Sequence, residues 1–289
     1  MYTIGIDIGS SAVKAAAVCF KDNIPDMNNI VCQRYDKSIT LMEILNNFID
    51  ICGKISGGMN ISRLCVTGAG SKGMDKDNIR ALTGLDTIIV DEFSANAEAG
   101  ALFVRDTDTA NKSKAFVNVC MGTGSSFILT KADEGAASKH FGGVGLGGGT
   151  ISGLSRLMIG TDSFDEIERL SAKGDVSNTD LRIKDISPVP LPGLDMEVTC
   201  SNFAKTSVHT KKEDIAAGIV YMVLENICQS AVLSGSRENV KLYVLTGGLT
   251  AFSMCRYVTK RFYSLCGAEF IIPDNAQYAT AIGAAVSRN

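Results

Sequence analysis

Residues 2–20 read YTIGIDIGSSAVKAAAVCF, two apolar runs separated by the short break Gly9-Ser10-Ser11. Two apolar runs joined by a Gly/Ser turn predict a β-hairpin. Glycine allows the backbone of such a turn to come close to a phosphate group, with successive N–H groups directed at its oxygens. The stretch is therefore either a plain structural hairpin or a phosphate-binding turn.

Two charged residues flank this turn. Asp7 ends the first strand, two residues before Gly9, and Lys14 lies in the second strand. A carboxylate at this position suits Mg²⁺, which usually takes one or two carboxylates together with water and phosphate oxygens. Lys14 can add positive charge. The alternative for Asp7 is a turn-forming role without a ligand.

Two further glycine turns follow predicted strands. A strand over 115–120 stops at Gly122-Thr123-Gly124-Ser125-Ser126 and resumes at 127–129, and a strand over 241–246 ends at Gly247-Gly248. The former offers amides and hydroxyls to a phosphate, and the latter allows a nucleobase or ribose to approach closely. Each turn alone also fits a structural role, but their succession along the chain favours a shared function.

The order of elements predicts a duplicated α/β fold. After the hairpin, the first half continues with a helix over 41–49, strands over 64–67 and 87–90, and a helix over 94–104 capped by Ser94. The second half again opens with strand, glycine turn and strand, and it also ends in strand and helix. The polar stretch 106–114 divides the chain into lobes 1–112 and 113–289.

The predicted strand over 87–90 is closed by Asp91-Glu92, and Glu92 lies just before a predicted helix. A carboxylate at such an edge can accept the proton of an attacking hydroxyl. In phosphoryl transfer this group mainly orients the nucleophile, while metal ions and amides stabilise the charge. The alternative is an ordinary exposed acid at the end of a strand.

A glycine-dense stretch, Gly142 to Gly149, leads into a predicted helix over 150–159, and His140 precedes it as a candidate pocket residue. Apolar residues from Ile215 to Ala231 recur with a helical period and predict a long helix. No Walker A pattern occurs. The glycine-dense stretch lies far from the N-terminal strand, which argues against a dinucleotide-binding fold.

Composition narrows the function class. The 289 residues carry a formal net charge of −3, so nucleic acid is not an expected partner. The 9 Cys include no CxxC pair and only 2 His are present, so the spacing of a zinc site is absent. The N-terminus lacks the basic region of a signal peptide, and no apolar run is expected to cross a membrane. We expect a cytoplasmic protein.

Together these segments resemble the sugar kinase, heat-shock ATPase and actin superfamily, and within it the type II pantothenate kinases. The segments that carry the resemblance are Asp7-Ile8-Gly9, Asp91-Glu92-Phe93, Gly122 to Ser126, Gly142 to Thr150, Ser163 to Ile167, and Ala281-Ile282-Gly283-Ala284. The resemblance spans nearly the whole chain. It implies a two-lobed, duplicated actin-like (ribonuclease H-like) α/β fold with a central nucleotide cleft.

The resemblance also implies an activity and a set of site residues. The activity is transfer of the γ-phosphate of ATP to pantothenate, giving 4′-phosphopantothenate in the first step of coenzyme A biosynthesis. Glu92 is the catalytic residue and Asp7 the Mg²⁺ ligand. The expected ATP-binding residues are Asp7, Gly9, Ser10, Ser11, Lys14, Gly122, Thr123, Gly124, Ser125, Gly247 and Gly248. The expected substrate residues are His140, Gly142, Gly143, Gly147, Gly148 and Gly149. A homodimer is implied, with the helix over 220–231 near its interface, and CoA or an acyl-CoA is a further candidate ligand.

The chain departs from the family pattern at three places. His140, preceded by Lys139, stands where the family places an arginine that contacts the pantothenate carboxylate. Ser10-Ser11 replaces the usual Gly-Thr, and Ile186-Ser187-Pro188 replaces a glycine-tyrosine pair. Three alternatives therefore stay open: a kinase for another small molecule such as an amino sugar, an ATPase activator of 2-hydroxyacyl-CoA dehydratases with an iron–sulfur cluster, and an ATP-binding sensor without catalysis.

Overall fold

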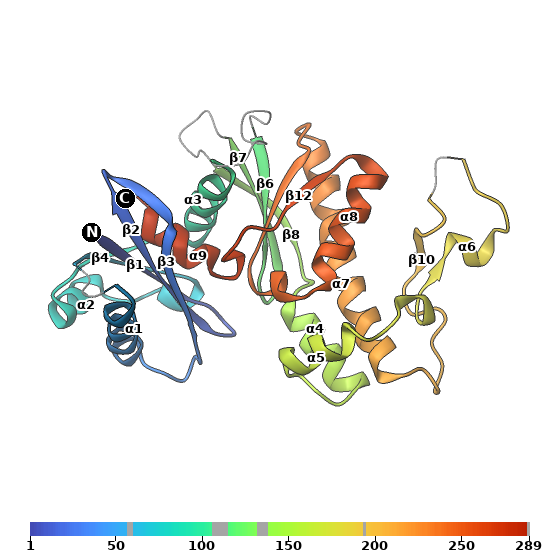
Figure 1. The fold of residues 1–289 in the computed structure, drawn as a ribbon, viewed down its shortest axis with the longest axis horizontal. Helices are drawn as coiled ribbons and strands as arrows, with labels where there is room; N and C mark the ends of the chain where they lie inside the picture. Colours follow the sequence, from blue (N-terminus) through green and yellow to red (C-terminus); the bar gives the residue numbers. More distant parts are fainter. Residues whose placement is uncertain (57–59, 106–114, 132–137, 193–194, 288–289) are drawn as a thin grey trace.

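Two five-stranded mixed sheets organise the structure, each forming one α/β lobe (Figure 1). The computed structural model describes residues 1–56, 60–105, 115–131, 138–192 and 195–287. The predicted two-lobed α/β architecture is confirmed. The predicted boundary between residues 112 and 113 lies outside the described residues, so the exact division stays a prediction.

The first sheet has the strand order β3-β2-β1-β4-β5. Its strands are β1 (Tyr2–Ile8), β2 (Val13–Lys21), β3 (Ile24–Tyr35), β4 (Ile61–Thr67) and β5 (Asp86–Ile89). The first three strands are antiparallel neighbours, and β4 and β5 run parallel to β1. Helix α1 (Leu41–Ser56) follows β3, and the short η1 (Ala69–Ser71) and α2 (Lys76–Thr83) join β4 to β5. The predicted N-terminal hairpin is confirmed.

The second sheet repeats this topology with the order β8-β7-β6-β11-β12. Its strands are β6 (Ala115–Met121), β7 (Ser125–Lys131), β8 (Ser138–Val144), β11 (Leu242–Thr246) and β12 (Glu269–Ile271). Again three antiparallel neighbours are followed by two strands parallel to the first. The duplication predicted from the order of elements is therefore present in the strand order and directions of both sheets.

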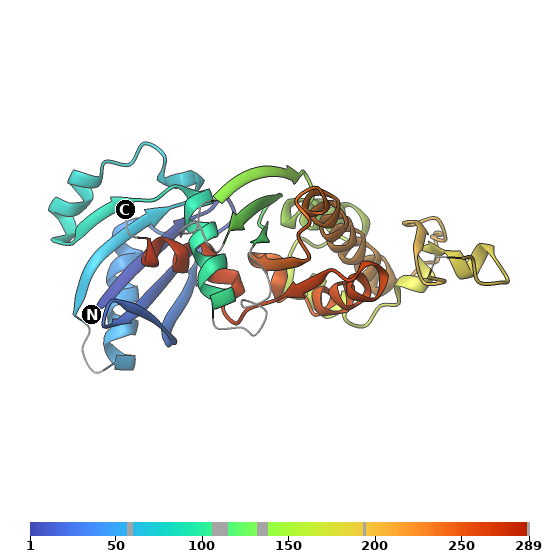
Figure 2. The same ribbon diagram turned by 90° about the horizontal axis from the view of Figure 1, so that it is seen from above.

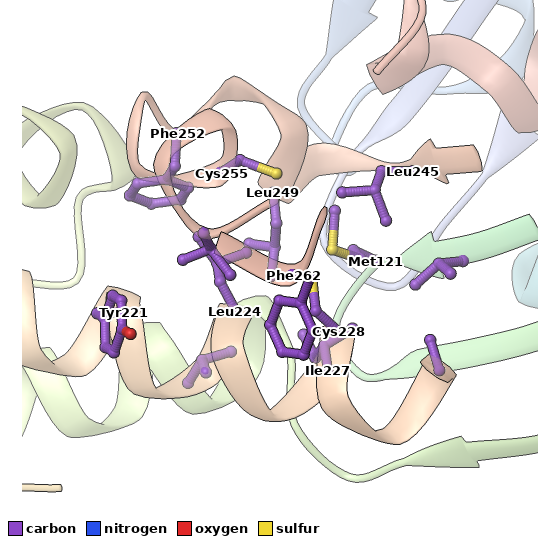
Figure 3. Close-up of a cluster of buried hydrophobic side chains, with 14 of the residues drawn as sticks. Met121, Tyr221, Leu224, Ile227, Cys228, Leu245, Leu249, Phe252, Cys255 and Phe262 are labelled. Atoms are coloured by element: carbon purple, nitrogen blue, oxygen red, sulfur yellow. The ribbon is translucent and has the colours of Figure 1, made fainter. Parts of the chain in front are cut away.

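The longer helices of the second lobe are α4 (Gly148–Met158), α5 (Phe164–Ser171), α7 (Lys212–Ser236) and α8 (Met254–Cys266), with the short η3 (Val176–Asn178), η4 (Gly248–Ala251) and η5 (Ala276–Tyr278) between them. Helices α7 and α8 pack on the sheet, while α4 and α5 pack on α7. Figure 3 shows side chains of α7 and α8 packed with Met121 of β6 and Leu245 of β11. This apolar cluster is the main core of the lobe.

Helix α7 has the length and composition of a membrane span, and it is the one such helix in the described ranges. Judged by length and composition alone, this helix could cross a membrane, contrary to the expectation that no apolar run could do so. Most of the helix is buried, with residues such as Ile219, Val223 and Ile227 fully inside the second-lobe core. A helix that is apolar on most sides is also what a protein core requires.

The two sheets meet through a pair of helices, α3 (Glu92–Arg105) and α9 (Ala279–Val286), which lie between them in Figures 1 and 2. Helix α9 ends the chain, yet it packs on β1, β2 and β4 of the first sheet. A methyl group added at Gly5 would overlap the Ala281 carbonyl, and one at Gly283 would overlap the Ala95 carbonyl. Both glycines are needed because the backbones of β1, α9 and α3 approach so closely.

Several local predictions need correction. Helix α3 begins at Glu92, not after Ser94, and the Asp91 carboxylate accepts hydrogen bonds from the N–H and hydroxyl of Ser94. The capping residue is therefore Asp91. Strand β3 and helix α2 were not predicted, because their mixed polar patterns lack a clean period. The glycine-dense stretch begins as β8, an edge strand of the second sheet.

A small arm extends from the second lobe (Figure 2). It contains β9 (Leu181–Arg182), α6 (Ile183–Ile186) and β10 (Thr199–Ser201). At its base the buried Asp180 carboxylate accepts hydrogen bonds from the Asn202 amide side chain and the Phe203 N–H. These bonds hold the two ends of the arm together.

The close packing of α9 predicts the effect of one methyl group. We expect Gly283→Ala to lower the free energy of unfolding by about 3 kcal/mol, because the new side chain forces α9 away from α3. The matched control is Gly153→Ala in helix α4, where no described atom beyond the neighbouring residues and the backbone of the helix itself lies within 4 Å of the added methyl group. In that variant the free energy of unfolding should rise by up to about 1 kcal/mol, because alanine favours a helix more than glycine does. Urea unfolding of both variants measures the difference, and equal stabilities would contradict the packing argument.

Candidate active site

A cavity of about 730 Å³ lies between the lobes. All three glycine turns open into it: the turn after β1, the turn after β6 and the turn after β11. It is lined by every residue predicted to bind the nucleotide, namely Asp7, Gly9, Ser10, Ser11, Lys14, Gly122, Thr123, Gly124, Ser125, Gly247 and Gly248. The turns at Gly9 and Gly124 thus face one shared space, although they belong to different sheets.

The first two turns touch each other. The hydroxyl oxygens of Ser10 and Ser11 lie 2.6 Å and 2.9 Å from the Thr123 hydroxyl oxygen. Three hydroxyl groups from two lobes therefore converge at one point of the cavity wall. Hydroxyls and glycine amides in such an arrangement are suited to the oxygens of a phosphate group.

Some backbone amides of these turns already have partners. The Gly122 N–H donates to the Gly124 carbonyl at 2.9 Å, and the Gly247 N–H donates to the Ala276 carbonyl at 2.8 Å. Gly247 adopts a φ of 94°, and a side chain there would overlap the Met121 carbonyl. These two glycines shape the turns, and their direct contact with a ligand stays a prediction.

Three charged side chains face the cavity from adjacent strands. In the sheet register Asp7 on β1 is opposite Lys14 on β2, and Lys14 is opposite Arg34 on β3. Burial raises the pKa of Asp7 to about 6; the Lys14 cation opposes this shift and the Glu92 carboxylate adds to it. Burial lowers the pKa of Lys14, an effect that Asp7 opposes and Arg34 reinforces. A buried carboxylate near a second carboxylate is a favourable place for a cation.

Glu92 is the first residue of α3 and lines the cavity. A buried network fixes this end of the helix. The Asn96 side-chain amide donates to the Glu92 carbonyl at 2.9 Å, and the Thr280 hydroxyl donates to the Asn96 side-chain oxygen at 3.0 Å. The Asn118 amide on β6 donates to the Asn96 carbonyl. Glu92 is thereby held relative to both lobes.

His140 lies on β8, and the structure does not place it on the cavity wall itself. Its ring stacks on Phe93, with centroids 4.4 Å apart and planes inclined by 25°. Phe93 does line the cavity and directly follows Glu92. His140 is therefore at the edge of the cavity, one aromatic ring away from the interior.

The glycine-dense stretch supports the second phosphate turn. The N–H groups of Gly148 and Gly149 donate to the carbonyls of Gly122 and Thr123 at 2.8 Å and 2.9 Å. A methyl group at Gly147 would lie 2.5 Å from the Thr123 carbonyl oxygen. Of this group only Gly148 lines the cavity.

The other predicted substrate glycines, Gly142 and Gly143, lie within β8 and pair with Phe127 and Ser126 of β7. A direct role in substrate binding stays a prediction for all of these glycines. The structure gives the stretch a supporting role, because its amides and tight backbone contacts hold the turn at Gly122.

Sequence reasoning missed several residues of the cavity wall. They are Arg34, Asn96, Cys120, Phe164, Asp165, Glu168, Phe252, Gln277, Tyr278 and Thr280. Asn96 was open to prediction, because it lies one helical turn after Glu92 and so shares its face. Arg34 and Glu168 carry no local motif, and only the tertiary fold brings them to the cavity.

A family model described as Fumble matches residues 3–287. The chain belongs to the Fumble family. Among curated relatives, a type II pantothenate kinase of Oceanobacillus iheyensis is 24% identical, with 99% of this chain and 100% of that protein covered. A type II pantothenate kinase of Bacillus cereus is 29% identical over 67% of this chain and 69% of that protein. The family resemblance predicted from the motifs is confirmed.

Solved structures share the fold of this Fumble-family chain. The activator of the 2-hydroxyisocaproyl-CoA dehydratase from Clostridium difficile with bound ADPNP has a TM-score of 0.61 at 19% identity, covering 99% of this chain and 93% of that one. A ROK family glucokinase from Streptomyces griseus in complex with glucose and AMPPNP has a TM-score of 0.56 at 13% identity, covering 99% and 98%. At these identities the likeness concerns architecture.

The raised pKa of Asp7 predicts a pH-dependent cost to stability. In the unfolded chain Asp7 ionises near its ordinary pKa of 3.8, whereas in the fold it ionises at about 6. Stability contributed by protonated Asp7 is thus present below pH 3.8 and lost as the pH rises through 6, a difference of about 3 kcal/mol.

Asp7→Asn removes this cost. We expect the variant without ligands to be more stable than wild type by about 3 kcal/mol at pH 8, and by roughly half of that at pH 5. Urea unfolding at both pH values measures the gain. A variant less stable than wild type at pH 8 would show that the carboxylate is held by favourable contacts.

Proposed function

We propose that this Fumble-family chain is an ATP-dependent kinase that phosphorylates pantothenate to 4′-phosphopantothenate, the first step of coenzyme A biosynthesis. The observation that carries the proposal is the convergence of three glycine turns and Glu92 on one cavity between two actin-like lobes. The curated type II pantothenate kinases that resemble the chain supply the substrate class.

In the proposed complex the phosphates of ATP lie among the turns at Gly9, Thr123 and Gly248. Lys14 and Arg34 line the same cavity and contribute positive charge from the first lobe. Asp7 suits a Mg²⁺ ligand, because its buried carboxylate faces the cavity and is destabilised as an anion. When bound, Mg²⁺ offsets the negative charge on the transferring phosphoryl group.

Glu92 is proposed to orient the primary hydroxyl of pantothenate and to accept its proton. Its position at the start of α3 fits this role, because Asn96 joins that helix end to Asn118 of β6 and to Thr280 of α9. A carboxylate fixed in this way aligns the attacking oxygen. Closure of the lobes would exclude water and limit hydrolysis of ATP.

The substrate carboxylate is proposed to bind near His140. The ring of this residue stacks on Phe93, so it lies beside the residue that follows Glu92. A histidine is a weaker anion partner than an arginine, which carries a permanent charge on a rigid fork of donors. The proposed site therefore recognises the carboxylate less strongly than a site with arginine would.

The proposal includes a cytoplasmic homodimer and CoA or an acyl-CoA as a further ligand, both by likeness to the family. Within the helix over 220–231, residues such as Val220, Leu224 and Ala231 are buried in the protomer. Gln229 and the later Leu233 are exposed on α7. A dimer contact through this helix would therefore use the exposed side around these two residues.

The alternatives are separable by simple assays. An amino-sugar kinase would release ADP with sugars and not with pantothenate. A dehydratase activator would contain iron and absorb visible light, and its likeness to the chain is one of fold alone. In the described residues no group of three or more His, Cys, Asp or Glu is arranged to hold a metal ion.

Replacing the catalytic carboxylate tests the kinase assignment. We expect Glu92→Gln to lower kcat for pantothenate-dependent ADP release by about a hundredfold or more, because the general base is lost. ATP affinity should change little, because Glu92 is assigned to the acceptor alcohol. Coupled ADP release and calorimetric ATP titration measure the two quantities. Unchanged turnover in Glu92→Gln would contradict the role of Glu92 as the base, whereas ATP binding without pantothenate-dependent turnover in either protein would favour a sensor that lacks catalysis.

Restoring the family residue tests the substrate. We expect His140→Arg to lower KM for pantothenate by about tenfold, since a charge-assisted, bidentate hydrogen bond replaces a mostly neutral ring. The matched control is Lys139→Arg on the same strand, whose side chain points to the other face of the sheet. A KM unaffected by His140→Arg would place the carboxylate elsewhere.

A further inference from the structure

Glu168 is a carboxylate in the cavity wall that the proposed reaction does not use. It lies on α5 and lines the cavity together with the turn residues Gly248 and Ala251. Its Oε1 accepts a hydrogen bond from the Ser253 N–H at 3.0 Å, which fixes the side chain between α5 and the start of α8. Its Oε2 is buried and has no hydrogen-bond partner in the described part of the chain.

A buried carboxylate oxygen without a partner is costly, because it has lost its water and gained no donor. Because Glu168 belongs to the cavity lining, a molecule that fills the cavity is the nearest source of the missing partner. The required partner is a hydrogen-bond donor. A phosphate group, which offers acceptors and negative charge, is unfavourable at this place.

The surroundings of Glu168 suit the nucleoside part of a nucleotide. Phe164 and Phe252 both line this section of the wall, and their rings meet edge to face with centroids 6.0 Å apart. Aromatic side chains and glycine turns provide an apolar, close-fitting surface for a flat base.

The two walls differ in the charges they carry. In the described lining, the cationic side chains Lys14 and Arg34 come from the first lobe, together with the carboxylates Asp7 and Glu92. The charged residues that the second lobe contributes to this lining are the carboxylates Asp165 and Glu168. A nucleotide has the same polarity, with anionic phosphates at one end and neutral N–H and O–H donors at the other. The cavity therefore favours one orientation of the nucleotide.

We propose that Glu168 determines nucleotide selectivity by accepting, through Oε2, a hydrogen bond from a neutral donor of the nucleoside, either a ribose hydroxyl or the exocyclic amine of the base. This inference rests on the proposed use of ATP in the cavity. It adds a specificity-determining residue to the ATP site, and it does not depend on pantothenate being the acceptor.

The test compares nucleotides that lack one donor. Calorimetry with wild-type protein measures Kd for ATP, 2′-deoxy-ATP, 3′-deoxy-ATP and ITP, without any acceptor substrate. We expect one of the three analogues to bind about ten- to a hundredfold more weakly than ATP, the usual range for a hydrogen bond to a charged group. A deoxy analogue identifies a ribose hydroxyl, and ITP identifies the base amine.

Glu168→Gln then links this loss to the side chain. The amide keeps an oxygen for the Ser253 N–H but replaces the second acceptor by a donor. We expect the variant to bind ATP about ten- to a hundredfold more weakly than wild type does. The analogue that wild type binds weakly should lose little further affinity in the variant, and if that analogue is ITP it should gain affinity. The control is Glu166→Gln on the same helix, an exposed residue whose carboxylate accepts from the Thr161 hydroxyl.

Two results would overturn the inference. One is a Glu168→Gln variant that binds all four nucleotides with the same change in affinity, which would indicate a purely structural role. The other is a wild-type protein that binds ATP and every analogue equally. This second test needs no variant, so it decides the question even if Glu168→Gln does not fold. Selective nucleotide binding without pantothenate phosphorylation would instead contradict the proposed function and leave this inference standing.

Discussion

The close contact of α9 with β1 and α3 is the constraint on which the rest of the structure depends. Gly5 and Gly283 remove the two side chains that would keep these backbones apart. Because α3 also packs on the second sheet, with Gly100 against Phe116 and Asn118, the helix pair fixes the sheets at a short separation. The strand ends that carry the glycine turns then open onto the same space.

The cavity combines two kinds of energetic cost that a ligand can relieve. Asp7 is ionised only against the effect of burial, and Glu168 keeps a buried oxygen without a partner. The first favours a cation and the second favours a donor. Sites that are unfavourable when empty bind charged or polar ligands selectively, at the expense of stability in the free protein.

The polar network behind the cavity connects the start of α3, which carries Glu92, to both lobes. Asn96 connects the start of α3 to α9 through Thr280, and Asn118 connects it to β6 and, through the Thr246 hydroxyl at 3.3 Å, to β11. A shift of one lobe relative to the other would therefore alter bonds that hold the helix end carrying Glu92. In the proposed kinase, this connection would let lobe closure position the carboxylate.

The sequence by itself determined the local chemistry: the hairpin at Asp7 to Lys14, the three glycine turns, the carboxylate at Glu92 and the repeated order of strands. These features are readable because strand periodicity and turn residues act over a few neighbouring positions. Tertiary structure alone decided that Arg34 and Glu168 join the cavity, that Gly148 and Gly149 support the second turn, and that α9 packs on the N-terminal sheet. Such contacts depend on how two sheets pack across many residues, and no local pattern encodes them.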